Sequence, residues 1–220
     1  MKKLAVLSMV LCVALSSAAF AAEEAKKDSE EGYVCLFNGK DLTGWIGATK
    51  AVEVKDGCIV YPPKGGGNLY TEKEYSDFSF KFEFKLTRNA NNGIGIRTPA
   101  KGDAAYAGME IQVLDNDGPA YAKLQPYQYH GSIYGIVPAK KGHLKPVGEW
   151  NCEEIIAKGR RITVILNGVT IVDADLDEAS KDGTMDHRQH PGLKNEKGHI
   201  GFLGHGSHVE FRNIRVKELK

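Results

Sequence analysis

From Gly32 onwards, apolar and polar residues alternate along the chain with a period of two, the pattern that β-strands produce. The clearest case is DFSFKFEFKL, residues 77–86, where Phe or Leu occupies every second position from Phe78 to Leu86. Polar and charged residues fill the positions between them. This segment predicts a half-buried antiparallel strand with a solvated outer face.

A second strong signal is Asn167-Gly168, which lies between two β-rich runs in RRITVILNGVTIV, residues 160–172. Asn-Gly is the preferred dipeptide of two-residue hairpin turns, so this segment predicts a β-hairpin. Only residues 174–181 have the composition of a short helix. Further strands are predicted at 34–38, 52–61, 92–97, 109–114, 131–137, 150–156, 198–203 and 208–218.

Many short strands separated by glycine-rich turns predict an all-β fold, namely a two-sheet antiparallel β-sandwich or jelly roll. We expect Trp45, Phe211 and Ile214 in its core. Four connections exceed the usual loop length and therefore suggest binding or lid functions. They are residues 98–107, 116–130, 138–149 and 173–197.

The first 21 residues have the three-part order of a secretory signal peptide: Lys2 and Lys3, an apolar run over 4–14, and small residues ending at Ala21. The apolar run is too short to span a bilayer. Residues 22–31, AEEAKKDSEE, are charged and predict a disordered leader. We therefore expect an exported protein, periplasmic or secreted, with a single domain over 32–220.

The chain has 29 basic and 28 acidic side chains, and loss of Lys2 and Lys3 keeps this balance near zero. Such a balance does not favour nucleic acid or an anionic membrane as a partner. Cys35, Cys58 and Cys152 remain after cleavage, so at most one internal disulfide can form. We expect Cys35–Cys58, with three unpaired buried thiols as the alternative.

The segment GMEIQVLDNDG, residues 108–118, combines a strand pattern with polar side chains. Apolar residues at 109, 111 and 113 alternate with Glu110 and Gln112, which therefore share one face about 7 Å apart. On the concave face of a sandwich sheet, such side chains point toward a ligand. The apolar pair Val113-Leu114 interrupts the alternation and predicts a bulge that turns Asp115 to the side of Glu110.

Arg97 ends the segment NGIGIR, residues 92–97. If Ile94 and Ile96 lie in the core, the intervening glycines clear a path and Arg97 reaches the same groove. There it would hold a sugar or an oxyanion and keep Glu110 ionised. The alternative is a structural salt bridge.

Several other side chains are candidates for ligand contacts. His130 and Tyr134 follow a long loop and suit leaving-group protonation or hydroxyl recognition. His205 lies between two glycines, which allow close approach of the backbone. Trp150 is expected either to stack on a sugar face or to be buried at the start of a strand.

Metal binding is a further open question. Asp186-His187 and His190 lie in the longest loop and could join a metal site or a lid. Residues 115–118, DNDG, look like the front half of a calcium loop, but the downstream glutamate is absent and an acidic turn is the default. A divalent cation could be held by Glu110, Asp115 and His205 and would polarise a bound oxygen group.

Six segments, in the same order along the chain, resemble the 3-keto-disaccharide hydrolase domain family. They are FNGKDLTGW (37–45), NNGIGIR (91–97), YAGMEIQVLD (106–115), GEWN (148–151), ILNG (165–168) and GHGSHVEFRNIRVKEL (204–219). The resemblance implies a concanavalin-A-like jelly roll that cleaves glycosides whose sugar is already oxidised at carbon 3. A separate dehydrogenase would perform that oxidation.

The strand at 110–115 also resembles the Glu-x-Asp-x-x-Glu strand of retaining glucanases, although it reads Glu-x-Gln-x-x-Asp. A conventional glycosidase needs two carboxyl groups about 5 to 9.5 Å apart. In a straight strand Glu110 and Asp115 would be about 16 Å apart. A 3-keto sugar needs only one base, one oxyanion stabiliser and one acid, because its ketone acidifies the hydrogen on carbon 2.

This chemistry gives a set of predicted roles. Glu110 is the base or a metal ligand, Arg97 stabilises the oxyanion, and His130 protonates the leaving group. The predicted substrate contacts are Gln112, Tyr134, Trp150 and His205, and Asp115 is the candidate second carboxylate. The alternatives are a non-catalytic carbohydrate-binding module on the same fold and a conventional two-carboxylate glycosidase.

Overall fold

The structure is a computed structural model that describes residues 32–64 and 66–220. The predicted signal peptide and the predicted leader both lie outside these residues. The chain divides into two units, Met1–Val34 and Cys35–Lys220, and the division falls within the short strand β1 (Val34–Cys35). Within the described ranges, no helix has both the length and the apolar character needed to cross a bilayer.

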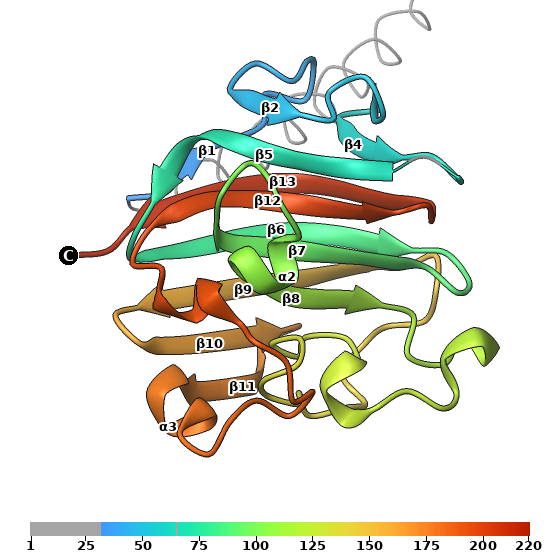
Figure 1. Ribbon diagram of the computed structural model, residues 1–220. Helices are drawn as coiled ribbons and strands as arrows, with labels where there is room; N and C mark the ends of the chain where they lie inside the picture. Colours follow the sequence, from blue (N-terminus) through green and yellow to red (C-terminus); the bar gives the residue numbers. More distant parts are fainter. Residues whose placement is uncertain (1–31, 65) are drawn as a thin grey trace, which may run out of the picture. The chain divides into compact units, whose positions relative to one another are not determined.

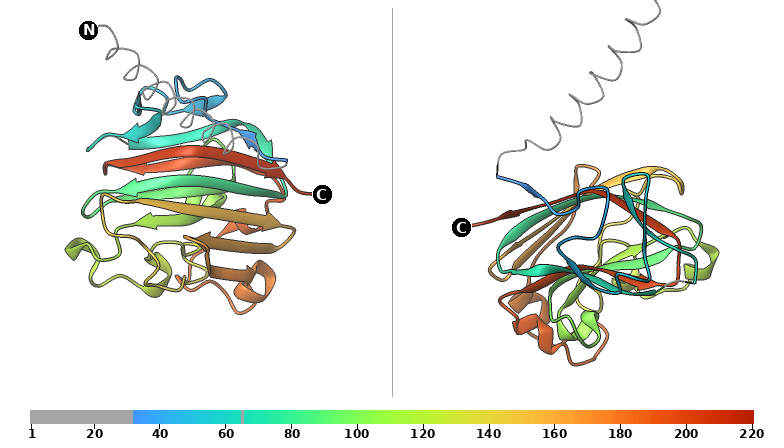
Figure 2. Two further views of the ribbon diagram at one scale, coloured as in Figure 1. Left: turned by 180° about the vertical axis from the view of Figure 1, so that it is seen from behind. Right: turned by 90° about the horizontal axis from the view of Figure 1, so that it is seen from above.

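Residues Cys35–Lys220 form two antiparallel β-sheets that pack face to face (Figure 1), seen as two layers of strands in the view from above (Figure 2, right). This confirms the predicted two-sheet sandwich. The larger sheet has the strand order β11-β10-β9-β6-β13-β4-β3, and the smaller has β2-β5-β12-β7-β8. The strands in the order given for the larger sheet are β3 (Glu53–Lys55), β4 (Cys58–Tyr61), β6 (Phe78–Leu86), β9 (Trp150–Lys158), β10 (Arg161–Leu166), β11 (Val169–Asp175) and β13 (Val209–Glu218).

The smaller sheet carries the strands that concern the functional site. They are β2 (Trp45–Gly47), β5 (Gly66–Tyr75), β7 (Asn91–Thr98), β8 (Met109–Leu114) and β12 (Gly198–His205). Short helices lie within the long loops: α2 (Ala104–Ala107), α3 (Leu176–Ser180), and the 3-10 turns η1 (Pro119–Tyr121), η2 (Pro126–Gln128) and η3 (Pro191–Lys194).

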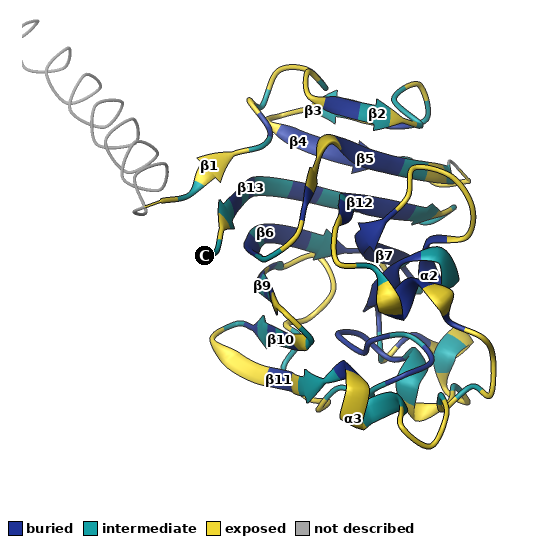
Figure 3. Ribbon diagram, turned by 60° about the vertical axis from the view of Figure 1, so that its left-hand side comes forward, coloured by how far each residue is buried: buried dark blue, intermediate teal, exposed yellow. Residues whose placement is uncertain are grey.

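The core lies between the facing apolar sides of the two sheets (Figure 3). Every apolar side chain of β6 at the alternate positions from Phe78 to Leu86 is buried, as the sequence pattern predicts. Phe202 of β12 stacks on Phe211 of β13 at 4.1 Å between ring centroids and on Trp45 at 5.5 Å. Burial of each such ring contributes about 1.5–3 kcal/mol, so these contacts fix how the sheets face one another.

The outer face of β6 differs from the plain solvated surface that was predicted. Glu83 is buried there and accepts hydrogen bonds from Arg212 at 2.7 Å and from Asn213 at 2.5 Å. Trp150 lies on the same face, with Arg212 3.9 Å and Lys85 4.8 Å from its ring centroid. Trp150 therefore packs under cations on the larger sheet and is not available to stack on a sugar in a groove of the smaller one.

The turns follow the sequence signals closely. β10 and β11 form the predicted hairpin, with Asn167 at φ +50° and Gly168 at φ +84°, the left-handed pair of a type I′ turn. The predicted helix at 174–181 is α3, which Asp175 caps by accepting the backbone N–H of Asp177 and Glu178. The predicted strand 52–61 is a hairpin instead, formed by β3 and β4.

β8 is the last strand of the smaller sheet, and residues 129–137 cover its outer edge. Residues 131–137 of this segment were predicted as a strand but make only isolated bridges, such as Ile111 with Ile133. Its backbone exchanges hydrogen bonds with Gln112, through Gly131 N at 2.7 Å and Ser132 O at 3.0 Å. The N–H of Tyr134 donates to the carbonyl of Glu110 at 2.9 Å. We call this the edge-covering segment.

The predicted Cys35–Cys58 disulfide is wrong, because Cys35, Cys58 and Cys152 are all free thiols. Each of the first two has its own local partner: Cys35 donates to the carbonyl of Phe37 at 3.0 Å, and Cys58 to that of Asp56 at 3.6 Å. Burial raises the pKa of the Cys58 thiol. The stability of the sandwich is therefore that of its core and not of a cross-link.

Candidate active site

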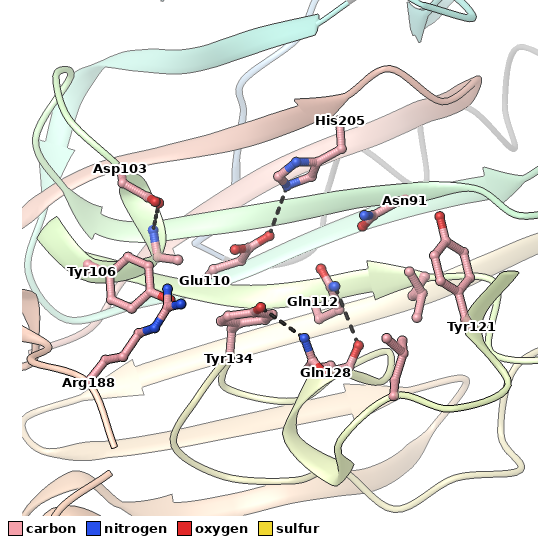
Figure 4. A pocket seen from close by; sticks show the side chains of 13 residues that line it. Asn91, Asp103, Tyr106, Glu110, Gln112, Tyr121, Gln128, Tyr134, Arg188 and His205 are labelled. Atoms are coloured by element: carbon pink, nitrogen blue, oxygen red, sulfur yellow. Dashed lines mark hydrogen bonds and ion pairs between the residues drawn. The ribbon is translucent and has the colours of Figure 1, made fainter. Parts of the chain in front are cut away.

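A pocket of about 380 Å³ lies over β8, walled by α2 and by residues from the loops 116–130 and 182–197 (Figure 4). Its volume falls in the range of small-molecule sites. We call it the β8 pocket. Its lining residues are Asn91, Asp103, Ala105, Tyr106, Glu110, Gln112, Leu114, Tyr121, Leu124, Gln128, Tyr134, Arg188 and His205.

The alternation of β8 places Glu110 and Gln112 on the pocket side, as predicted from the sequence. β7 and β8 pair in unbroken register from Asn91 opposite Leu114 to Ile96 opposite Met109, so the predicted bulge is absent. Leu114 also lines the pocket. Leu114 therefore continues the pocket face, and the apparent break in the pattern is an apolar patch in the lining.

Because no bulge forms, Asp115 does not join Glu110. Its buried carboxylate accepts the backbone N–H of Asn89 at 2.8 Å and lies 3.9 Å from Arg88. Asn116 accepts the N–H of His130 at 2.9 Å, so this acidic stretch is a structural turn. Among residues 32–64 and 66–220, no three His, Cys, Asp or Glu side chains are grouped to hold a metal ion.

Glu110 is the recessed acid of the pocket, with its side chain 7% exposed. Its Oε1 lies 3.4 Å from Nε2 of His205, whose side chain is 44% exposed at the rim. The hydrogen bond and charge of Glu110 raise the pKa of His205, against an opposing effect of burial. A carboxyl group and an imidazole therefore meet inside one pocket.

Gly93, opposite Gln112 on β7, leaves the space that Glu110 occupies. A Cβ at this position would lie 2.0 Å from Oε1 of Glu110 and 2.7 Å from its carboxyl carbon. The glycine does clear a path, as expected, but Glu110 and not Arg97 uses it. In one orientation the Gln112 amide donates to the carbonyl of Asn92 at 2.9 Å and to Glu110 at 3.3 Å; in the other it donates to the carbonyl of Gln128 at 3.4 Å. The first orientation makes two contacts and holds the Glu110 carboxylate.

The edge-covering segment and the turn before it bring two further side chains to the pocket. Gln128 donates to the hydroxyl of Tyr134 at 3.0 Å, and the backbone of Tyr134 is bound to Glu110 as described above. Tyr127 packs edge-on against the Tyr134 ring at 6.1 Å. Tyr134 is thus held beside Glu110, in agreement with the placement expected from the sequence.

The loop 182–197 supplies a cation to the pocket. Arg188 donates to the hydroxyl of Tyr106 at 2.8 Å, and both side chains line the same end (Figure 4). Asp186 and His190 lie behind them: His190 contacts Asp186 at 3.0 Å and the carbonyl of Ala105 at 3.2 Å. Burial raises the pKa of Asp186, but hydrogen bonds from His190 and the Arg188 backbone bring it below its usual value. The Asp186–His190 pair braces α2 against the loop.

Arg97 does not reach the pocket, so its predicted placement is wrong. Its backbone is left-handed, at φ +47°, which turns the side chain away from the alternation of β7. The buried guanidinium donates to Asp77 at 3.0 Å and to the carbonyls of Ser76 at 3.0 Å and Gly159 at 2.7 Å. Arg97 is the structural salt bridge that the sequence left as the alternative.

His130 also lies outside the pocket, between the two sheets. Its Nδ1 accepts the backbone N–H of Leu114 at 3.3 Å, and its ring packs on Phe84 at 5.1 Å. Nε2 is 2.9 Å from a carboxylate oxygen of Glu153 on β9, although the two atoms are not aligned for a hydrogen bond. His130 therefore joins the strand that carries Glu110 to the opposite sheet and is not placed to protonate a ligand.

The lining residues that were not identified from the sequence include Asp103, Tyr106 and Arg188. Asp103 caps α2 by accepting the N–H of Ala105 at 3.1 Å. A signal was present in the lengths of the loops 98–107 and 173–197, which predicted binding functions. Arg188 is moreover the only arginine of the second loop.

These features define a β-sandwich protein with a pocket of small-ligand size, to which the smaller sheet presents one recessed carboxyl group and one imidazole and the loop 182–197 presents one guanidinium. The chain belongs to the family described as the 3-keto-alpha-glucoside-1,2-lyase-like domain, whose sequence model matches residues 32–217. This confirms the family that the six sequence segments indicated.

Similar proteins agree with this assignment. A protein of Bacteroides thetaiotaomicron named 3-keto-disaccharide hydrolase is 29% identical over 229 residues, covering 86% of this chain and 79% of the relative. A crystal structure from Parabacteroides distasonis, described as that of a candidate glycosyl hydrolase, has a TM-score of 0.76 and 27% identity over 88% of this chain and 97% of its own. A non-specific endo-beta-1,3(4)-glucanase has a TM-score of 0.56 at 13% identity, covering 86% and 92%, which shows a shared fold.

Proposed function

We propose that this protein is an exported enzyme that cleaves 3-keto-glycosides by removing the proton on carbon 2 and eliminating the substituent on carbon 1. The observation that carries the proposal is the contact between recessed Glu110 and His205, 3.4 Å apart in the β8 pocket. Family membership and the name of the Bacteroides relative support a 3-keto sugar as the substrate. The pattern of residues 1–21 supports export.

The chemistry assigns one task to each charged group. Glu110 takes the proton from carbon 2, and the electron pair passes to the carbon 3 oxygen, which becomes an oxyanion. Arg188 and the hydroxyl of Tyr106 stabilise this charge. The ketone then re-forms at carbon 3, and the electron pair of the enolate forms a double bond between carbons 1 and 2 as the carbon 1–oxygen bond breaks. Protonated His205 gives its proton to the leaving oxygen.

The products of this step are two molecules: the enone of the sugar and the alcohol that left carbon 1. Addition of water completes a hydrolysis: the water oxygen bonds to carbon 1 while the water gives one proton to neutral His205, and the proton held by Glu110 returns to carbon 2. The ketone of the substrate must come from a separate oxidising enzyme.

Two other functions have weaker support. A conventional glycosidase on this strand would pair Glu110 with Asp115, which does not line the pocket. A carbohydrate-binding module would favour aromatic platforms. The pocket does contain tyrosines, but Glu110, Arg188 and His205 converge among them, as reactive groups do in enzymes.

The test uses a 3-keto-disaccharide and its unoxidised parent in deuterated buffer. The proposal expects cleavage of the oxidised sugar alone, with deuterium appearing at carbon 2. Glu110→Gln should abolish both, whereas Glu72→Gln, an exposed change of the same kind on β5, should abolish neither. Cleavage of the parent sugar, or exchange that persists in Glu110→Gln, would overturn the assignment.

A further inference from the structure

The β8 pocket has two chemically different ends on either side of Glu110. Asp103, Tyr106 and Arg188 lie at one end, and Asn91 and Tyr121 lie at the other (Figure 4). We call them the charged end and the Leu114 end.

The floor between the ends is β8 itself. Glu110, Gln112 and Leu114 enter the pocket at successive alternate positions. At about 3.4 Å per residue, Leu114 lies about 14 Å along the strand from Glu110. This length accommodates a sugar ring and one further group attached to it.

Three apolar surfaces meet at the Leu114 end. Leu114 forms its buried floor, and the partly exposed side chains of Leu124 and Tyr121 form its wall. The Tyr121 hydroxyl donates to the carbonyl of Asn89 at 3.0 Å, so the ring and not the hydroxyl is left for a ligand. Asn91 adds an amide at the same end.

The wall is held in place before any ligand binds. The N–H of Ala120 donates to the side chain of Asn89 at 3.1 Å, close to the Tyr121 contact. Gln125 and Gln128 cap η2 reciprocally, and Gln125 N donates to Gln128 Oε1 at 3.0 Å. A preformed wall lowers the entropy cost of binding.

The direction of the substrate follows from the proposed function, on which this inference rests. Carbon 2 lies between carbons 1 and 3. If Glu110 addresses carbon 2 and Arg188 holds the carbon 3 oxygen, carbon 1 and its substituent point away from the charged end. They extend along β8 toward Leu114.

We propose that the Leu114 end is an aglycone subsite, and that the substrates are 3-keto-glycosides of flat apolar alcohols, such as aryl or arylmethyl groups. A second sugar ring carries hydroxyl groups on all sides, and burying them against Leu114 and Leu124 without hydrogen bonds costs free energy. An aromatic ring gains contacts with the same two side chains and with Tyr121.

The experiment measures equilibrium binding to Glu110→Gln by titration calorimetry, so that leaving-group reactivity does not contribute. The probes are the methyl, benzyl and glucosyl 3-keto-glucosides of one anomer. Benzyl should bind at least about tenfold tighter than the other two, since one well-placed apolar group is worth about 10- to 200-fold. Adding Leu124→Asn should reduce this preference to about threefold or less without changing methyl affinity, whereas Lys123→Asn should leave it intact.

The outcomes separate the two proposals. If the glucosyl compound binds as tightly as the benzyl compound, or Leu124→Asn weakens all three equally, the aglycone assignment is overturned even where the wild-type protein cleaves them. If the wild-type protein cleaves none of the three, the proposed function is overturned, and the assignment of a leaving-group subsite is overturned with it.

Discussion

Replacing His130 with leucine should destabilise the fold strongly, because it isolates a buried charge. Glu153 is 3% exposed, and neither of its carboxylate oxygens accepts a hydrogen bond within the described part of the chain. Its partner is the His130 imidazole, whose Nε2 lies 2.9 Å from a carboxylate oxygen. Removing one partner of such a buried pair costs about 3–5 kcal/mol of unfolding free energy.

A second substitution separates the charge effect from the loss of packing. In His130→Leu with Glu153→Leu no carboxylate remains, and apolar replacement of both partners is often neutral. The backbone N–H of Leu114 still loses its acceptor, the His130 Nδ1, which costs about 1–3 kcal/mol. Both variants lose this acceptor, so its cost cancels, and the double variant should be more stable than His130→Leu alone by about 3–5 kcal/mol.

The assay is equilibrium unfolding in urea, comparing midpoints at unchanged slope. The control is Glu178→Gln, which breaks the exposed pair with Lys181 at 3.1 Å and should cost less than about 1 kcal/mol. If the double variant is less stable than His130→Leu, or its loss is the sum of the two single losses, then Glu153 is not the source of the cost.

Two further predictions concern the pocket. Gly93→Ala should reduce turnover by about a hundredfold, because the new Cβ would lie 2.0 Å from Oε1 of Glu110 and displace that carboxyl group. The control is Gly66→Ala, whose new Cβ would have its nearest neighbouring atom 3.6 Å away, and it should retain activity in the same assay. The pKa of His205 is raised by Glu110, so its protonated form stabilises the fold at low pH and this contribution is lost as pH rises through the raised pKa. Turnover should fall over the same pH range, and Glu110→Gln should move the His205 midpoint, followed by NMR, to lower pH; an unchanged midpoint would contradict the pairing.

The architecture of the sandwich could be predicted wherever apolar residues alternate strictly. The strand at 77–86 and the hairpin at 160–172 are examples. β5 was missed because its buried residues Leu69, Tyr70 and Thr71 are consecutive and are followed by three exposed charged residues. The segment 131–137 is apolar enough for a strand but folds back on itself, with Ile133 bridging to Val137.

The site was predictable only where the backbone is regular. Alternation places Glu110 correctly on the pocket face of β8. The same alternation placed Arg97 wrongly, because its backbone is left-handed and no pattern in the sequence indicates its φ of +47°. Arg188 and Tyr106 belong to loops about 80 residues apart that the fold brings together through a hydrogen bond, so neither could be assigned from local sequence.

The edge-covering segment has a consequence for handling the protein. An open strand edge is a template on which a second chain can add its own strand, and β8 would present such an edge if residues 129–137 came away. The same residues deliver Tyr134 to the pocket. Variants that loosen this segment should therefore lose solubility together with turnover, and self-association will accompany inactivation there more than elsewhere in the molecule.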